Sequence, residues 1–360
     1  MVFVLEKLLT DVFDPQPGEL VLVACDLPAG SAADSAAWRE RRAMAAEWHA
    51  AFEKLGRRMG FEVLPLVTYA ATGSNGAELP SRARMGEQDV SLEESLLRST
   101  LAAFLTQFSA TAPLDAYCRR KQDFRAASMP GIQKSMEATA LSADYREVAR
   151  RCAILEQLLV GAERLEVRFS TGHRCGFDLR HRKPEVDDGF LPRGKRGDRI
   201  INLPSGETFI VPYEGEQPGQ PSLTQGELPL RCGAELAVLQ VHANRITAVV
   251  GAGPQAARLR QFFAEDPARA NVAEVAFGCN DHAQVTGNVL EDEKAGFHWA
   301  YGRSDHLGGV VGVKDFARPA NVVHQDVVYA KESPIQVAEA TLLRPGSQSQ
   351  VMRDGAYVVF

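Results

Sequence analysis

The second half of the chain carries four carboxylates and two imidazoles in short motifs that could together bind metal ions. They are Glu207, Glu274, Glu293, His298, His324 and Asp326. Four negative charges balance two divalent cations. Two ions that share a carboxylate, with neutral histidines at the outer positions, lower the pKa of a bridging water and polarise a scissile carbonyl. The set therefore predicts a dinuclear centre for hydrolysis, and mixed carboxylate and imidazole donors accept Zn, Co, Mn or Fe.

The stretch "NVLEDEKAGFHWAYG" (288–302) supplies Glu293 and His298. A continuous helix would put them on different faces, so both can reach one ion only if the chain turns at Ala295–Gly296. We expect Asp292 to support the ligand histidine and Glu291 to be solvated. The alternative is a polar turn followed by a core or surface histidine.

The other donors lie in strand-like runs. Glu274 interrupts "VAEVAFG", which should be buried, so this carboxylate needs a metal or a basic partner. His324 and Asp326 in "NVVHQDVVY" share one face of a strand. Glu207 follows a Pro-Ser-Gly turn in "NLPSGETFIVP". Taken singly, each has an ordinary alternative, such as a polar strand face or a solvated turn residue.

A nucleotide site is a weaker alternative. The segment 246–263 contains G-x-G-x-x-A at Gly251, Gly253 and Ala256, with Glu274 downstream as a conceivable ribose-binding acid. Pro254 suits the first turn of any helix, however, and the unit is solitary. A simple turn from strand to helix is sufficient to explain the pattern.

Around these motifs the sequence indicates two domains. Residues 1–162 form an N-terminal α/β domain with a parallel sheet: buried strands at 19–25 and 61–70 flank a helix closed by Gly60, and further helices follow near 91–107 and 142–162. Residues 163–360 form a β-rich α+β C-terminal domain that carries the metal-binding catalytic residues, with one good helix at 254–265.

Composition narrows the class of protein. A net charge of -6 over 360 residues gives no reason to expect nucleic acid or an anionic membrane as a partner. The first residues lack the pattern of a secretory signal, and no apolar run has membrane-spanning length. The six cysteines form no C-x-x-C pair, which argues against a disulfide framework or a thiolate zinc site. A cytoplasmic location is expected.

As a set, "NLPSGETFIVP", "VAEVAFG", "TGNVLEDEKAGFHWAYG" and "NVVHQDVV" resemble the metal-binding half of the thermophilic-type metalloaminopeptidases, the aminopeptidase T and aminopeptidase S family. The similarity is greatest to the short leucyl aminopeptidase branch. It implies an N-terminal α/β domain, a β-rich domain with two divalent ions, a homodimer, and cleavage of N-terminal residues from peptides. It places the family's six ligands on the six residues above, with Glu274 as the bridging one.

One position departs from the family. Better-known members have a tyrosine seven residues after the first ligand histidine, where this chain has Asp305. Tyr301 and His306 are therefore the candidate catalytic side chains, and Asp292, Glu214 and Glu216 are candidate anchors for a substrate amine or candidate bases.

Two other functions remain open. A small non-peptide amide could be the substrate. The chain also resembles, more weakly, the iron-dependent 2,5-dihydroxypyridine 5,6-dioxygenase, which holds a single Fe(II) with histidine in place of the strand glutamate. Because Glu207 and Glu274 are both present, we favour the hydrolase. A metal-free binding protein would leave four carboxylates repelling one another.

Overall fold

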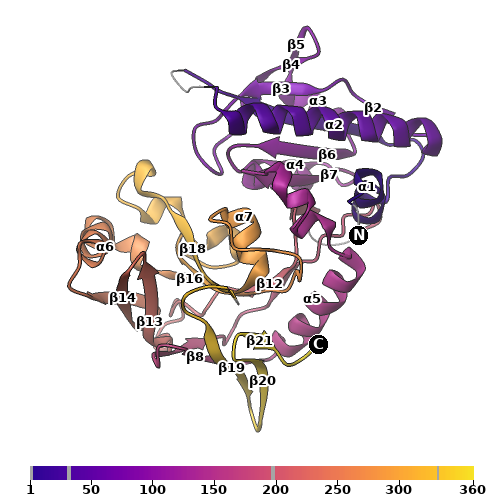
Figure 1. Cartoon of the computed structure of the whole chain (residues 1–360). Coiled ribbons are helices and arrows are strands. Elements are labelled where there is room, and N and C mark those ends of the chain that lie inside the picture. The colour runs from indigo at the N-terminus through magenta and orange to yellow at the C-terminus, as the bar shows by residue number, and fades with distance from the viewer. Residues whose placement is uncertain (1–2, 31–33, 196–198, 331) are drawn as a thin grey trace. The chain divides into compact units, whose positions relative to one another are not determined.

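The computed structural model describes residues 3–30, 34–195, 199–330 and 332–360 (Figure 1). Contacts divide the chain into two compact units. The first unit comprises Met1–Ala149, Asp187–Gly206 and Asn280–Gln284, and the second comprises Arg150–Val186, Glu207–Cys279 and Val285–Phe360. The boundary expected near residue 162 stays a prediction. No helix within the described ranges is long and apolar enough to cross a membrane.

The first unit is built on a mixed eight-stranded sheet of order β11-β7-β6-β1-β3-β4-β5, with β2 also paired to β1. The central strands run parallel, and β4 and β5 add to the sheet in antiparallel fashion. This confirms the predicted α/β class. The strands are β1 (Leu20–Leu27), β2 (Glu62–Val63), β3 (Val67–Ala70), β4 (Arg82–Met85), β5 (Gln88–Ser91), β6 (Leu101–Thr106), β7 (Arg125–Pro130) and β11 (Ile200–Asn202).

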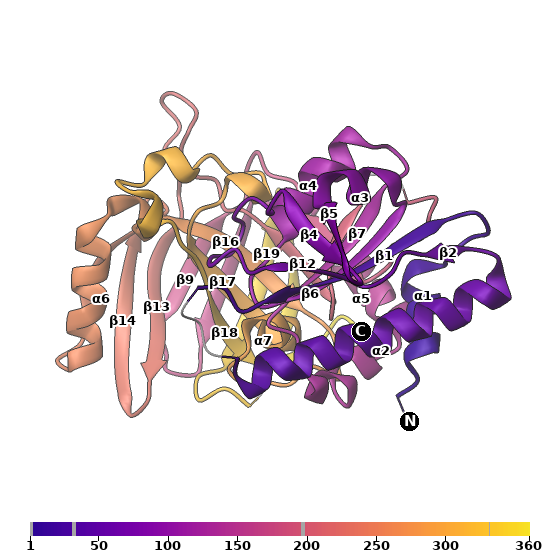
Figure 2. The same cartoon turned by 90° about the horizontal axis from the view of Figure 1, so that it is seen from above.

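Helices cover both faces of this sheet (Figures 1 and 2). The long helix α2 (Ala36–Met59) begins at Ser35, whose side chain caps it, and ends at Gly60 in the left-handed conformation. Its apolar stripe is buried along the sheet and against α1 (Leu5–Phe13). The opposite face packs on α3 (Leu92–Arg98) and α4 (Thr111–Arg120). Helix α5 (Tyr145–Leu159) follows the short helices η1 (Lys134–Glu137) and η2 (Ala140–Ser142).

Two predicted elements of this unit are wrong in part. The helix expected over 91–107 stops at Arg98, and Leu101–Thr106 is the strand β6. All six residues of β6 are buried, so the run is apolar on both faces and lacks the alternation that marks a half-exposed strand. The strand expected over 61–70 is split into β2 and β3 at Pro65, which has no N–H to donate.

The second unit contains an antiparallel sheet of eight strands in the order β15-β14-β13-β9-β8-β19-β20-β21. Helix α6 (Pro254–Glu265), predicted to the residue, follows β15. The strands are β8 (Arg164–Phe169), β9 (Arg174–Asp178), β13 (Gln225–Cys232), β14 (Glu235–His242), β15 (Arg245–Val250), β19 (Val337–Arg344), β20 (Ser347–Arg353) and β21 (Ala356–Tyr357).

A second sheet of this unit has the order β10-β12-β16-β17-β18. Its strands are β10 (Glu185–Asp187), β12 (Glu207–Ile210), β16 (Val272–Gly278), β17 (Gly296–Gly302) and β18 (His324–Ala330). Phe297 on β17 packs against Phe169 and Phe177, and Tyr329 on β18 lies 4.7 Å from Phe169 between ring centroids. One face of this smaller sheet is therefore an aromatic core against the larger sheet, as expected for a β-rich domain.

Candidate metal centre

Strand register places five of the six predicted donors on one face of the smaller sheet. Glu207 pairs with Gly278, and His298 pairs with Ala276, two residues from Glu274. Because directly opposed residues and alternate residues share a face, these three side chains project to the same side. Ala300 on β17 pairs with Glu274 on β16 and with Asp326 on β18. Gly302 pairs with His324. This face is the one turned away from the aromatic core, since Phe297 and Tyr329 occupy the alternate positions.

Small residues at the intervening positions make room for the donors. Ala276, Gly278, Ala300 and Gly302 lie on the same face as the carboxylates and imidazoles. Larger side chains there would fill the space into which the donors converge. On this face of the sheet, alanine and glycine therefore lie between the donor residues.

The sixth donor, Glu293, comes from a short turn rather than a strand. Helix α7 (Val289–Asp292) continues into η4 (Glu293–Ala295), and β17 begins at Gly296, which confirms the turn predicted at Ala295–Gly296. The turn lies directly on β16, because a Cβ on Gly278 would be 2.1 Å from the Glu293 carbonyl oxygen. Glycine at 278 is therefore what allows Glu293 to approach the sheet.

The six side chains form three overlapping groups, in each of which the donor atoms lie within 4.8 Å of one another. The groups are Glu207, Glu274 and His298; Glu274, His324 and Asp326; and Glu293, His298 and Asp326. Glu274 belongs to two of the groups. Its Oε1 is 3.8 Å from His298 Nε2 and its Oε2 is 3.0 Å from His324 Nε2.

Both histidines are oriented in the way that metal-binding histidines usually are. His324 Nδ1 lies 2.7 Å from the Arg303 carbonyl oxygen and His298 Nδ1 lies 3.3 Å from that of Gly296. A neutral ring that donates through Nδ1 presents the Nε2 lone pair on its other side. In both rings that lone pair faces carboxylate oxygens, which are also acceptors.

These facing acceptors indicate a cation. Glu207 Oε2 is buried, 3.3 Å from His298 Nε2, and has no hydrogen-bond donor. Two acceptors at this distance repel each other unless a proton or a metal ion lies between them. The residues present therefore fit a divalent cation, whose oxygen and imidazole ligands they would supply.

The titration behaviour of the side chains reflects the same need for positive charge. Burial opposes the charged form of His298, but contact with Glu207 and the charges of Glu274 and Asp326 outweigh it and raise its pKa to about 9. For Glu293, burial has the largest effect and raises the pKa. The positive charge of Lys294 lowers it and the negative charges of Glu207 and Asp326 raise it, and the resulting pKa is about 8. Protons thus occupy the cluster when no metal does.

Sequence reasoning missed Lys294. Its side chain is fully buried, and Nζ donates to Glu207 Oε1 at 2.5 Å and to Glu293 Oε1 at 2.6 Å. The signal was its place beside a predicted ligand and two residues before an apolar strand. A lysine in an acidic run is ordinarily solvated, which hides such a residue.

The neighbours of Glu293 differ from expectation. Asp292 does not support His298: its carboxylate accepts from the backbone N–H groups of Thr286 and Gly287, at 2.7 and 3.2 Å, and so closes the preceding loop. The Gly296 carbonyl takes the role expected of Asp292. Glu291 is 1% exposed, so the prediction of a solvated side chain is wrong.

The structure does not bring Tyr301 into the donor cluster. Its ring lies on the aromatic side of β17, 5.2 Å from Phe263 and 5.9 Å from Phe262 between centroids. His306 lies closer, with its ring edge-on to that of His324 at 5.1 Å. Asp305, at the position of the family's tyrosine, is exposed and pairs with Arg303.

The two other candidate amine anchors already have partners. Glu214 accepts from Asn271 Nδ2 at 2.7 Å and from Ser304 Oγ at 2.6 Å, and pairs with Arg182 at 3.2 Å. Glu216 pairs with the same arginine. Both carboxylates therefore tie loops together.

The glycine motif at 251–256 is a turn, as the simpler interpretation held. Strand β15 pairs antiparallel with β14, so no parallel βαβ unit is present there. The N–H groups of Gln255 and Ala256 donate to the Glu235 carboxylate at 3.1 and 3.0 Å. The chain's own anion fills the position that a phosphate would occupy.

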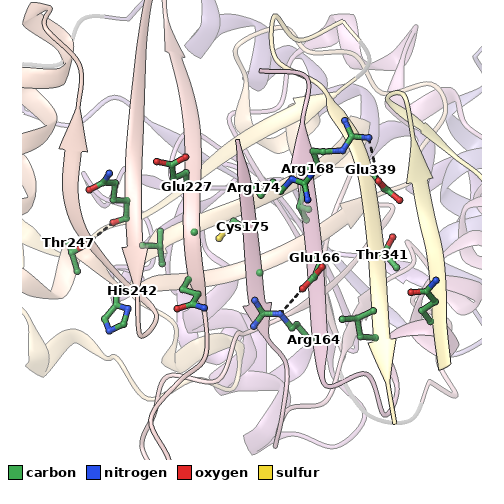
Figure 3. A pocket seen from close by; sticks show the side chains of 18 residues that line it. Arg164, Glu166, Arg168, Arg174, Cys175, Glu227, His242, Thr247, Glu339 and Thr341 are labelled. Atoms are coloured by element: carbon green, nitrogen blue, oxygen red, sulfur yellow. Dashed lines mark hydrogen bonds and ion pairs between the residues drawn. The ribbon is translucent and has the colours of Figure 1, made fainter. Parts of the chain in front are cut away.

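A separate hollow lies on the face of the larger sheet opposite its aromatic core (Figure 3). Four of its charged side chains form two ion pairs: Arg164 lies 3.1 Å from Glu166, and Arg168 lies 3.4 Å from Glu339. None of the six donors lines it. The hollow is therefore not part of the candidate metal centre.

Comparison with known proteins supports the fold. No family model matches the chain, and no curated protein matches it in sequence. The structure of 2,5-dihydroxypyridine dioxygenase from Pseudomonas putida KT2440 is similar, with a TM-score of 0.66 and 16% identity over 98% of this chain and 96% of that one. Wild-type AmpT from Thermus thermophilus is also similar, with a TM-score of 0.55 and 14% identity over 99% of both chains. The fold is therefore the two-domain, aminopeptidase T-like one.

Proposed function

We propose that this protein is a metal-dependent hydrolase with two divalent ions, and specifically an aminopeptidase that removes N-terminal residues from peptides. The observation that carries the proposal is the sharing of Glu274 between two donor groups, one completed by Glu207 and His298 and the other by His324 and Asp326. A carboxylate that serves two groups suits a pair of neighbouring ions.

In this proposal the chain's residues hold and orient the metal centre. His298 and His324 present Nε2, each fixed by a backbone carbonyl at Nδ1. Bound divalent ions would supply an activated water and polarise the scissile carbonyl. His306, beside His324, is the side chain from which we expect a hydrogen bond to the substrate carbonyl. Tyr301 is the weaker candidate, because its ring lies in the aromatic cluster.

A mononuclear Fe(II) ring-cleaving dioxygenase is the second candidate, since the similar structure from Pseudomonas putida is that of a 2,5-dihydroxypyridine dioxygenase. Non-heme Fe(II) oxygenases commonly hold iron with two histidines and one carboxylate. Among the described residues, each of the three donor groups contains only one histidine. The donor set therefore favours the hydrolase.

Metal content and substrate choice test the proposal together. Protein purified without chelators should contain about two divalent ions per chain, measured by mass spectrometry of the elements. It should hydrolyse aminoacyl p-nitroanilides and dipeptides, and leave their N-acetylated counterparts intact because the free amine is needed. Cleavage of both forms would indicate a small-amide hydrolase. One iron per chain with oxygen-dependent opening of 2,5-dihydroxypyridine would establish the dioxygenase instead.

The homodimer implied by the family resemblance stays a prediction. Light scattering of the purified protein would measure its mass against the 39.2 kDa of one chain.

A further inference from the structure

Lys294 places a positively charged group inside the donor cluster. Its ammonium lies between Glu207 Oε1 and Glu293 Oε1, at 2.5 and 2.6 Å. The side chain is 0% exposed. A buried ammonium is unfavourable unless carboxylates compensate it, so this lysine is held in the cluster by the same residues that would bind metal.

The ammonium engages one oxygen of Glu207 and leaves the other unpaired. Glu207 Oε1 accepts from Lys294, whereas Oε2 faces His298 Nε2 without a donor. The backbone at Lys294 is fixed as well, because a Cβ on Gly278 would lie 2.6 Å from its carbonyl carbon. The turn from which the lysine side chain projects therefore packs directly on β16.

We propose that Lys294 is a built-in cation that occupies one cation position of the cluster and so limits divalent ions to the positions that share Glu274. This rests on the proposed metal-dependent function. Three donor groups are present among the described residues. The ammonium pairs with Glu293, which belongs only to the group that lacks Glu274, and with one oxygen of Glu207 from another group. A third divalent ion would be repelled by the ammonium and would find Oε1 of both glutamates already bound.

Two substitutions separate the charge of Lys294 from its volume. Lys294→Ala removes both and opens space between Glu207 and Glu293. Lys294→Met removes the charge but fills the space. Lys314→Ala, at an exposed lysine of the same unit, is the matched control. Binding of Mn²⁺ to metal-free protein is measured by calorimetry, and bound manganese per chain by elemental analysis.

We expect Lys294→Ala to bind one more Mn²⁺ per chain than the wild type. Lys294→Met should bind the wild-type number at least tenfold more tightly, because an opposing charge is gone. The control should match the wild type. An unchanged or smaller number of ions in folded Lys294→Ala, or unchanged or weaker binding in Lys294→Met, would overturn the proposal.

Failure of the inference differs from failure of the proposed function. A wild type that binds no Mn²⁺ contradicts the metal-dependent function, whereas a wild type that binds Mn²⁺ with no gain in the variants contradicts only the role of Lys294. If Lys294→Ala does not fold, Lys294→Met decides the question. Added Mn²⁺ should also raise the melting temperature of Lys294→Met more than that of the wild type, which is a readout independent of activity.

Discussion

At the scale of single residues, Glu274 is a buried carboxylate whose negative charge must be compensated. It lies in a strand whose residues are all buried, and each of its oxygens faces a histidine nitrogen. No lysine or arginine pairs with it among the described ion pairs, so its compensation must come from protonated histidines or from metal. This residue therefore joins the two halves of the cluster.

We predict that Glu274→Ala loses both ions and lowers turnover by at least roughly 100-fold, since even the outer partners of metal ligands are worth about 10- to 100-fold. The alanine fits beside Ala276 and Ala300, so the variant should fold. Elemental analysis, turnover and circular dichroism measure the outcome, with Glu332→Ala at an exposed position as control. Two retained ions with near-normal turnover would contradict the bridging role.

The pH dependence follows from two side chains. In metal-free protein the pKa of His298 is about 9, above its ordinary 6.5, so its contribution to stability is complete below pH 6.5 and lost as pH rises through 9. The pKa of Glu293, about 8 instead of 4.5, acts in the same direction, because folding disfavours its ionised form.

Metal-free protein should therefore unfold at lower urea at pH 9 than at pH 6.5. Affinity for Mn²⁺ should rise over the same interval, by up to about tenfold per pH unit for each proton displaced. Titration calorimetry in buffers of different ionisation enthalpy would count the released protons. Stability that rises with pH in the absence of metal would contradict this account.

The predicted donors and the missed Lys294 show what residue patterns reveal. Glu274 and the pair His324 and Asp326 were predictable because a polar side chain in an apolar run needs a partner or a metal ion to offset its burial. Asp292 was placed wrongly because its carboxylate had two possible partners, the histidine and the loop amides, and only the folded backbone decides between them. Lys294 was hidden because its partner Glu207 lies 87 residues away.

At the scale of elements, capped helices and the buried strands β1 and β16 were predictable, whereas the buried strand β6 was not. Helix α6 begins at Pro254 and α2 ends at Gly60, which are local signals. Strand β6 has no such signal, because alanine and leucine suit a helix equally well when both faces are buried. Its identity as a strand depends on pairing with β1 and β7, which lie far away in the sequence.

The contact between η4 and β16 can be tested at Gly278. An alanine there would place its Cβ 2.1 Å from the Glu293 carbonyl oxygen, and backbone atoms cannot yield as a flexible side chain can. We predict that Gly278→Ala displaces the turn, costs about 1–3 kcal/mol of stability and weakens metal binding. Gly194→Ala, where a Cβ meets nothing within 4 Å, is the control. Equal urea midpoints and metal affinities for the two variants would contradict the proposed close approach.

At the scale of the whole molecule, all six donors and Lys294 belong to the second unit, whereas the parallel sheet belongs to the first. A ligand stabilises the structure that binds it, by about 2.7 kcal/mol at a concentration 100 times its dissociation constant. If the units open independently, the gain should be confined to the second unit. Hydrogen exchange followed by mass spectrometry resolves the two sheets.

We predict that saturating Mn²⁺ slows exchange of the amides in β16 and β17 by up to about 100-fold, which is the equivalent of that free energy. Amides in β1 and β6 should exchange at their metal-free rates. Glu274→Ala should show no slowing in either sheet, which separates binding at the cluster from general effects of the salt. Equal slowing in both sheets would mean that the units open as one cooperative body, because metal held by the second unit would then protect the first as well.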